Sequence, residues 1–177
     1  MAIRDILIAQ NQADRLEMQR QAAQDQRAQR KLRNMLNVIS EKIDTARVYG
    51  QNVEEMTSLD DVNATIKKQQ AQKTGYAPAD DRIDAEINKS ELQANKIIFT
   101  QELTDKAMNL LPKMESEGAV DVINNMTNTL INSQEQLTNQ GRTRIQEYIN
   151  NADNRLKTIE YLKQFGDDRT TPGIETN

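Results

Sequence analysis

Glycine and proline are scarce in this chain, and this scarcity constrains the fold more than any other feature. The 177 residues include six Gly and three Pro, which separate long stretches rich in Ala, Gln, Glu, Lys, Arg, Leu and Met. These residue types have high intrinsic helix propensities. The sequence therefore predicts an all-α protein.

Side chains for a thick core are also scarce. Hydrophobic residues make up 36% of the chain, with two Phe, four Tyr and no Trp, whereas typical domains are roughly 45–50% apolar with Gly counted. Gln and Asn together contribute about a fifth of the residues. We therefore expect an elongated hairpin or bundle of long helices with coiled-coil-like seams, whose remaining apolar surface is covered by other chains.

The helix-breaking residues divide the chain into five segments. The linker is expected because Gly50 can end the first helix and the run Thr74–Pro78 favours a loop. The predicted segments are a long helix over 1–49, a linker over 50–79 with a short helix over 58–72, a helix over 80–117 kinked at Pro112, a helical hairpin or a long helix broken at Gly141 over 118–165, and an extended tail over 166–177.

Two stretches carry apolar residues at alternating steps of three and four, the spacing of a coiled-coil seam. The N-terminal seam consists of Leu32, Leu36, Ile39 and Ile43. The C-terminal seam consists of Ile123, Met126, Leu130, Leu137, Ile145, Ile149, Leu156 and Ile159. Both seams are predicted to serve in packing, within one chain or between copies.

The composition excludes most catalytic sites. Without His or Cys the chain cannot form a Ser-His-Asp triad, a cysteine nucleophile, a His/Cys zinc site or a disulfide framework. Its glycines form no phosphate-binding loop. Adjacent acidic pairs, of which Asp80-Asp81 is one, are expected to cap helices or to stay solvated. The sequence thus predicts no enzymatic activity, no cofactor and no metal site.

A basic stretch over residues 15–33 has six basic and two acidic side chains, although the whole chain carries a net charge of −4. It has two interpretations. It could form a polar subunit interface, or it could contact nucleic-acid phosphates through Arg20, Arg27, Arg30, Lys31 and Arg33. The interface is the favoured interpretation, because no aromatic residue lies in the stretch to stack on bases. A membrane partner is not expected, since the N-terminal apolar run over 6–9 is too short to span or to direct secretion.

The stretch Gln19–Arg30, with the sequence QRQAAQDQRAQR, is typical of the chain's Gln-, Ala- and Arg-rich character. In this style the chain resembles helical structural or internal, ejection-type proteins of tailed bacteriophage virions. The resemblance implies a non-enzymatic structural protein of the neck, tail or interior, present in several copies. Its partners would be further copies and other structural proteins, and its place would be the virion after synthesis in the host cytoplasm.

Two other hypotheses remain open from the residues. A DNA-contacting packaging or ejection protein would use the basic stretch over 15–33. A cytoplasmic coiled-coil adaptor of a cell would carry the same two seams, because the spacing of a seam does not identify the chain that covers it.

Overall fold

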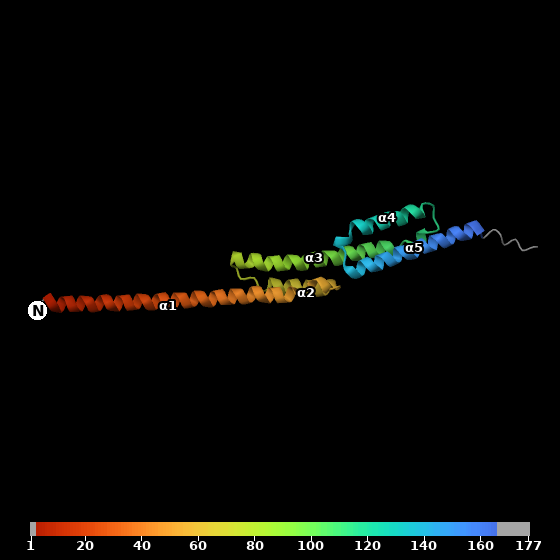
Figure 1. Cartoon of the computed structure of the whole chain (residues 1–177). Helices are drawn as coiled ribbons and strands as arrows, with labels where there is room; N and C mark the ends of the chain where they lie inside the picture. The colour runs from red at the N-terminus through yellow and green to blue at the C-terminus, as the bar shows by residue number, and fades with distance from the viewer. Residues whose placement is uncertain (1–2, 166–177) are drawn as a thin grey trace, which may run out of the picture. The chain divides into compact units, whose positions relative to one another are not determined.

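The computed structural model describes residues 3–165 and, within the first helix, the side chains of Ile8 and of the residues from Gln10 onward. Its elements are helices, and no strand occurs among these residues, which confirms the all-α prediction. The predicted tail over 166–177 lies outside this range. The helices are α1 (Ile3–Gly50), α2 (Leu59–Gln70), α3 (Ala77–Met108), α4 (Ala119–Asn132) and α5 (Asn139–Phe165), joined by the short 3₁₀ helices η1 (Val53–Glu55), η2 (Leu111–Lys113) and η3 (Gln134–Gln136) (Figure 1).

The chain folds into two compact units whose segments alternate along the sequence. The first unit comprises Met1–Gln51 and Lys67–Ile87, and the second comprises Asn52–Ile66 and Asn88–Asn177. Because the boundaries fall inside α2 and α3, both helices contribute residues to each unit.

A buried glutamine links the three helices of the first unit. Gln69 is fully buried, and its Nε2 donates hydrogen bonds to the Ala46 carbonyl at 3.2 Å and to the Glu86 carbonyl at 3.4 Å. A Cβ at position 50 would lie 2.7 Å from this nitrogen, so glycine at that position allows the close approach. A buried amide is tolerated when its polar atoms are paired in this way.

The core of the second unit contains the C-terminal seam. Six of its residues are buried there together with Leu103, Ala107, Leu110, Met114 and Ala119, whereas Leu156 and Ile159 pack against the cluster and stay partly exposed. Helices α4 and α5 contact each other in this core. The seam therefore packs within the chain. A smaller cluster of the same unit joins Val53, Val62, Ala94 and Ile97.

Helix α3 begins and ends at different residues from those that the sequence predicts. It begins at Ala77 and not at residue 80, because Pro78 lies in the first turn, where a missing N–H is tolerated. It ends at Met108. The kinked helix expected over 80–117 is therefore wrong, and Pro112 instead lies within the separate 3₁₀ helix η2, where no continuous α-helical hydrogen bonding is required.

The break between the last two helices also differs from the prediction. The chain leaves the α-helical conformation over residues 133–138, and Gly141 lies inside the first turn of α5. Thr138 precedes that helix, and its Oγ1 accepts a hydrogen bond from the Gly141 N–H at 3.1 Å. A threonine in this position is a favourable N-cap, which explains why α5 begins here and why Gly141 is not the break.

Candidate interaction surface

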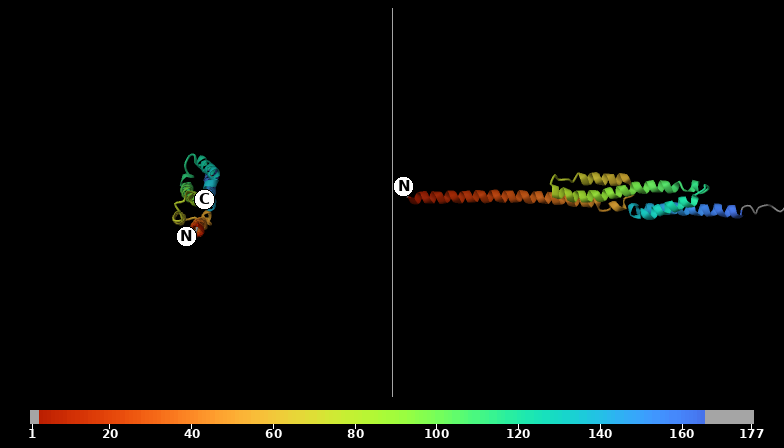
Figure 2. Two further views of the ribbon diagram at one scale, coloured as in Figure 1. Left: turned by 90° about the vertical axis from the view of Figure 1, so that its left-hand side faces the viewer. Right: turned by 90° about the horizontal axis from the view of Figure 1, so that it is seen from above.

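The N-terminal part of α1 is a long exposed surface. Every described side chain from Ile8 to Val38 is exposed, and Figures 1 and 2 show no other element of the first unit beside most of this segment. We call residues 8–38 of α1 the exposed stretch. Helices in proteins gain most of their stability from tertiary packing, so this segment lacks the contacts that normally stabilise a helix of its length.

The N-terminal seam is divided between the core and this surface. Ile43 is buried and Ile39 is half-buried, whereas Leu32 is 58% exposed and Leu36 is 54% exposed. The spacing of three and four continues one helix face across all four residues. The same face that packs inside the first unit near Ile43 therefore stays uncovered by the chain further toward the N-terminus.

Beside this uncovered face lies a groove of about 790 Å³. Met35, Val38 and Ile39 of α1 line one side, and Tyr76 with its two preceding residues in the loop between α2 and α3 lines the other. Lys31 and Lys42 also line it. Sequence reasoning missed Tyr76, although an aromatic residue in a loop of a chain with so few aromatic residues is a usable signal.

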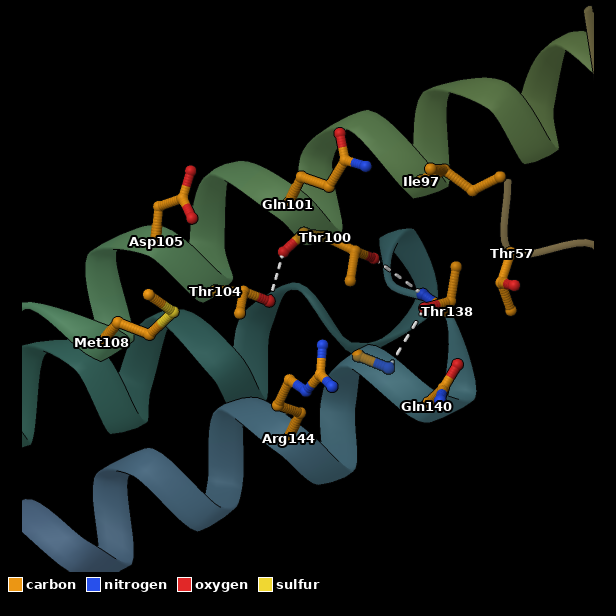
Figure 3. A pocket seen from close by; sticks show the side chains of 11 residues that line it. Thr57, Ile97, Thr100, Gln101, Thr104, Asp105, Met108, Thr138, Gln140 and Arg144 are labelled. Atoms are coloured by element: carbon orange, nitrogen blue, oxygen red, sulfur yellow. Dashed lines mark hydrogen bonds between the residues drawn. The ribbon is translucent and has the colours of Figure 1, made fainter. Parts of the chain in front are cut away.

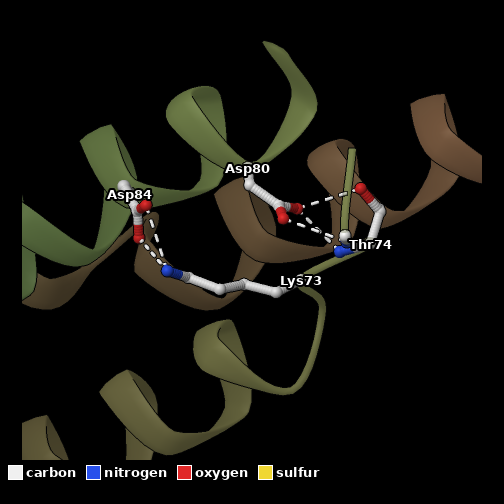
Figure 4. A network of polar contacts seen from close by, with 5 residues as sticks. Lys73, Thr74, Asp80 and Asp84 are labelled. Atoms are coloured by element: carbon white, nitrogen blue, oxygen red, sulfur yellow. Dashed lines mark hydrogen bonds and ion pairs between the residues drawn. The ribbon is translucent and has the colours of Figure 1, made fainter. Parts of the chain in front are cut away.

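The loop that presents Tyr76 is held by Asp80 in the first turn of α3 (Figure 4). The Thr74 N–H donates to Asp80 Oδ1 at 2.7 Å, the Thr74 hydroxyl donates to the same oxygen at 2.9 Å, and the Gly75 N–H donates to Oδ2 at 3.0 Å. Gly75 has a φ of +78°, a backbone conformation that residues other than glycine rarely adopt. Asp80 thus closes the loop with three hydrogen bonds.

An ion pair supports the same loop. Lys73 Nζ lies 2.7 Å from Asp84 Oδ1, and the hydrogen bond to Asp84 holds the pKa of Lys73 above its usual value. The pKa of the Asp80 carboxyl lies below its ordinary value of 3.8, mainly because the Thr74 N–H donates a hydrogen bond to it. The hydrogen bonds from the Thr74 hydroxyl and the Gly75 N–H lower this pKa further. Both groups are structural supports of the groove.

The lowered pKa predicts a pH dependence of the loop. A depressed folded-state pKa means that the ionised Asp80 stabilises the fold above its ordinary pKa of 3.8 and that this contribution is lost as the pH falls through the lower folded value. We expect Asp80→Asn to reduce the hydrogen-exchange protection of the Thr74 and Gly75 amides at pH 6, measured by NMR. The wild type should lose the same protection once the pH has fallen below the folded-state pKa of Asp80. Equal protection in wild type and variant at pH 6 would contradict this, and Asp81→Asn is the matched control.

The five basic residues singled out in the sequence all lie on the exposed stretch. None of Arg20, Arg27, Arg30, Lys31 and Arg33 forms an ion pair within the part of the chain that is described. Arg30 is two residues from Leu32 and therefore lies about 160° around the helix from it. The structure thus brings them together on one helix, mainly away from the uncovered apolar face, where they are accessible to an anionic partner.

A second cavity, of about 430 Å³, lies in the second unit (Figure 3). Three of the threonines that line it form hydrogen bonds within the fold. Thr104 donates to the Thr100 carbonyl at 2.7 Å, the Thr138 N–H donates to Thr100 Oγ1 at 3.0 Å, and Thr138 Oγ1 caps α5 at Gly141. Of these bonds, the one between Thr138 and Thr100 joins α3 to the start of α5.

The described residues include no cluster of three or more carboxylates placed to hold a metal ion. Asp60 and Asp61 occupy the first turn of α2, where acids complement the helix dipole, and the Asp61 N–H donates to Ser58 Oγ at 3.4 Å. None of the helices in the described range has the length and apolar character needed to cross a membrane.

Comparison of the chain with protein-family models, with curated protein sequences and with solved structures yields no match. The function is therefore inferred from the chemistry and exposure of the chain's own residues.

Proposed function

We propose that this chain is a non-enzymatic structural subunit of a large assembly, present in several copies, and that the assembly is the virion of a tailed bacteriophage. The single observation that carries the proposal is the exposed stretch of α1, whose Leu32 and Leu36 continue a buried helix face into solvent. Exposed apolar surface rimmed by polar side chains is characteristic of protein interfaces.

The length of the exposed stretch supports an assembly role. Residues 8–38 extend over about 45 Å at the rise of an α-helix. A mostly polar helix with few apolar side chains on its surface is marginally stable by itself. It needs contacts from other chains to remain ordered. Several copies or other structural proteins of the particle would supply these contacts.

The chemistry of the described residues supports a role without catalysis. Catalytic groups commonly have shifted pKa values and lie in a cleft. Lys73 and Asp80, whose pKa values are displaced, close a surface loop. At the cavity of the second unit, the hydroxyls of Thr100, Thr104 and Thr138 are engaged in hydrogen bonds within the fold.

The placement in a phage virion rests on the Gln-, Ala- and Arg-rich style of the sequence, of which Gln19–Arg30 is the example. The finer architecture belongs to the same proposal. The N-terminal seam acts as a coiled-coil seam between chains.

The proposal predicts that one charge on the uncovered face prevents assembly. Leu36→Asp should weaken self-association about 100-fold or more, because an unpaired buried charge costs several kcal/mol. At concentrations where the wild type is also monomeric, it should leave the thermal unfolding temperature unchanged, since Leu36 is exposed in the chain. Sedimentation velocity over a range of concentrations measures the association.

Leu92→Asp is the matched control, because Leu92 is 62% exposed on α3 and lies outside both seams. This variant should associate like the wild type. A wild-type protein that sediments as a monomer at every concentration and melts in one cooperative transition would overturn the proposed function.

A further inference from the structure

We propose that the exposed stretch of α1 pairs with the same stretch of a second copy of this chain, in antiparallel orientation, about a twofold axis beside Arg20. This inference rests on the proposed function, because it names the partner that covers the uncovered face. The pairing is a two-stranded coiled coil, and its register follows from the spacing of the N-terminal seam.

The seam defines a seven-residue register that can be extended toward the N-terminus. From Leu32 the alternating steps of three and four lead through the exposed stretch to Ile8. The positions on this line are Ile8, Asn11, Arg15, Met18, Ala22, Asp25, Gln29 and Leu32, and all of their side chains are exposed. Apolar residues stand at its two ends, and a positive and a negative charge stand symmetrically between them.

An antiparallel copy matches this line to itself residue by residue. The facing pairs are Ile8 with the partner's Leu32, Asn11 with the partner's Gln29, Arg15 with the partner's Asp25, and Met18 with the partner's Ala22. Seam positions alternate between two kinds, those followed by a step of three (a) and those followed by a step of four (d). Each facing pair joins an a position of one copy to a d position of the other, as the layers of an antiparallel coiled coil require. Apolar residues meet apolar residues, amides meet amides, and opposite charges meet.

A parallel copy in register does not match. It would set Arg15 against the partner's Arg15 and Asp25 against the partner's Asp25, both at seam positions. Like charges held at such positions repel each other and disfavour the parallel pairing. The antiparallel copy instead forms two Arg–Asp pairs for each dimer, so charge complementarity selects the orientation.

The residues beside the seam agree with this arrangement. Gln19 and Gln21 flank the twofold axis, where each faces its own copy and an amide can both donate and accept. Arg20 and Arg27 fall on the outer side of the register, away from the partner. The basic side chains of the exposed stretch therefore do not repel one another across most of the interface.

Cross-linking tests the orientation, and the absence of native cysteine makes it direct. Two variants, Ile8→Cys and Leu32→Cys, are prepared separately and mixed with a short bifunctional maleimide. We expect cross-linked dimers in the mixture and none in Ile8→Cys alone, because the two copies of residue 8 would lie about 36 Å apart along the helices. A dimer formed by Ile8→Cys alone would show a parallel pairing and overturn the inference.

Charge reversal tests the register independently. Arg15→Asp and Asp25→Arg should each raise the dimer dissociation constant about tenfold or more, and the double variant should return to within about threefold of wild type, since coupled charge pairs restore each other. Arg27→Asp, on the outer side, is the matched control. All three substituted positions are exposed in the chain, so circular dichroism melts recorded well below the dimer dissociation constant should not change. Failure of the double variant to recover would overturn the register.

The two proposals fail in different ways. A wild type that is monomeric at all concentrations removes the proposed function together with this pairing. A wild type that associates, but gives cross-links in Ile8→Cys alone or no rescue by charge reversal, removes only the antiparallel pairing about Arg20.

Discussion

Ile145→Ala is expected to lower the free energy of unfolding of the second unit by about 2–5 kcal/mol, the usual range for this truncation in a core. Ile145 is fully buried in α5 and belongs to the cluster shared with α3 and α4. The loss combines the transfer free energy of the removed methyl groups with the cavity that they leave. Urea denaturation followed by far-ultraviolet circular dichroism measures it. Tyr148 packs against the same cluster and reports the unit by fluorescence.

Leu162→Ala provides the control for this prediction. Leu162 lies on the same helix and is 58% exposed. Its truncation should change the free energy of unfolding by no more than about 0.5 kcal/mol if no other chain covers it. Comparable losses in the two variants would contradict the assignment of Ile145 to the core.

Gly141→Ala has the second largest expected effect on folding stability, and the sign of this effect tests the structure. In an open helix this change stabilises by about 1 kcal/mol, because alanine has the higher helix propensity. At position 141 a Cβ would overlap Thr100 Cγ2 and lie 2.9 Å from Thr138 Oγ1. We therefore expect a destabilisation of about 1–3 kcal/mol, as overpacking usually costs, measured by the same urea denaturation.

Thr100→Ser supplies the rescue for that variant. Serine keeps the hydroxyl that accepts the Thr138 N–H and removes the methyl group that a Cβ at position 141 would meet. The double variant Thr100→Ser/Gly141→Ala should recover at least half of the loss. If Gly141→Ala raises the stability, or if Thr100→Ser gives no recovery, the close approach of α5 to α3 is not as the structure describes it.

The two seams show what the spacing of apolar residues can and cannot predict about burial. Both follow the same steps of three and four, and both indicate a helix with one apolar face. In the C-terminal seam the face is covered by the chain itself, with Ile145 and Ile149 buried. In the N-terminal seam Ile43 is buried and Leu36 is exposed. Spacing identifies the face but contains no information about the element that covers it.

The helix ends show that local sequence predicts some helix boundaries and not others. Ser58 and Asp61 begin α2 through a local hydrogen bond, which the sequence signals at short range. Gly141 was expected as a break because glycine disfavours helices, yet it lies inside α5, where Thr100 approaches from 41 positions earlier in the chain. A glycine retained for a close tertiary approach cannot be distinguished by local sequence from a glycine at a helix end.

The candidate surface was likewise only partly predictable. The basic and apolar residues of α1 are visible in the sequence, and so is the loop that contains Gly75. The three hydrogen bonds that Asp80 accepts depend on how the loop folds back on the first turn of α3. The position of Tyr76 in one groove with Met35 depends on how this loop lies against α1. A buried Gln69 at the centre of the first unit was also hidden, since glutamine is usually exposed.

By itself, the sequence determines that this protein is helical, because helix propensity and the step of an apolar face depend on residues a few positions apart. It also determines that His- or Cys-based chemistry is absent. Only the tertiary structure decides that the C-terminal seam is covered within the chain and that Leu32 and Leu36 are not. Burial is a property of contacts between distant segments, and the same apolar spacing is compatible with a core, an interface or an uncovered surface.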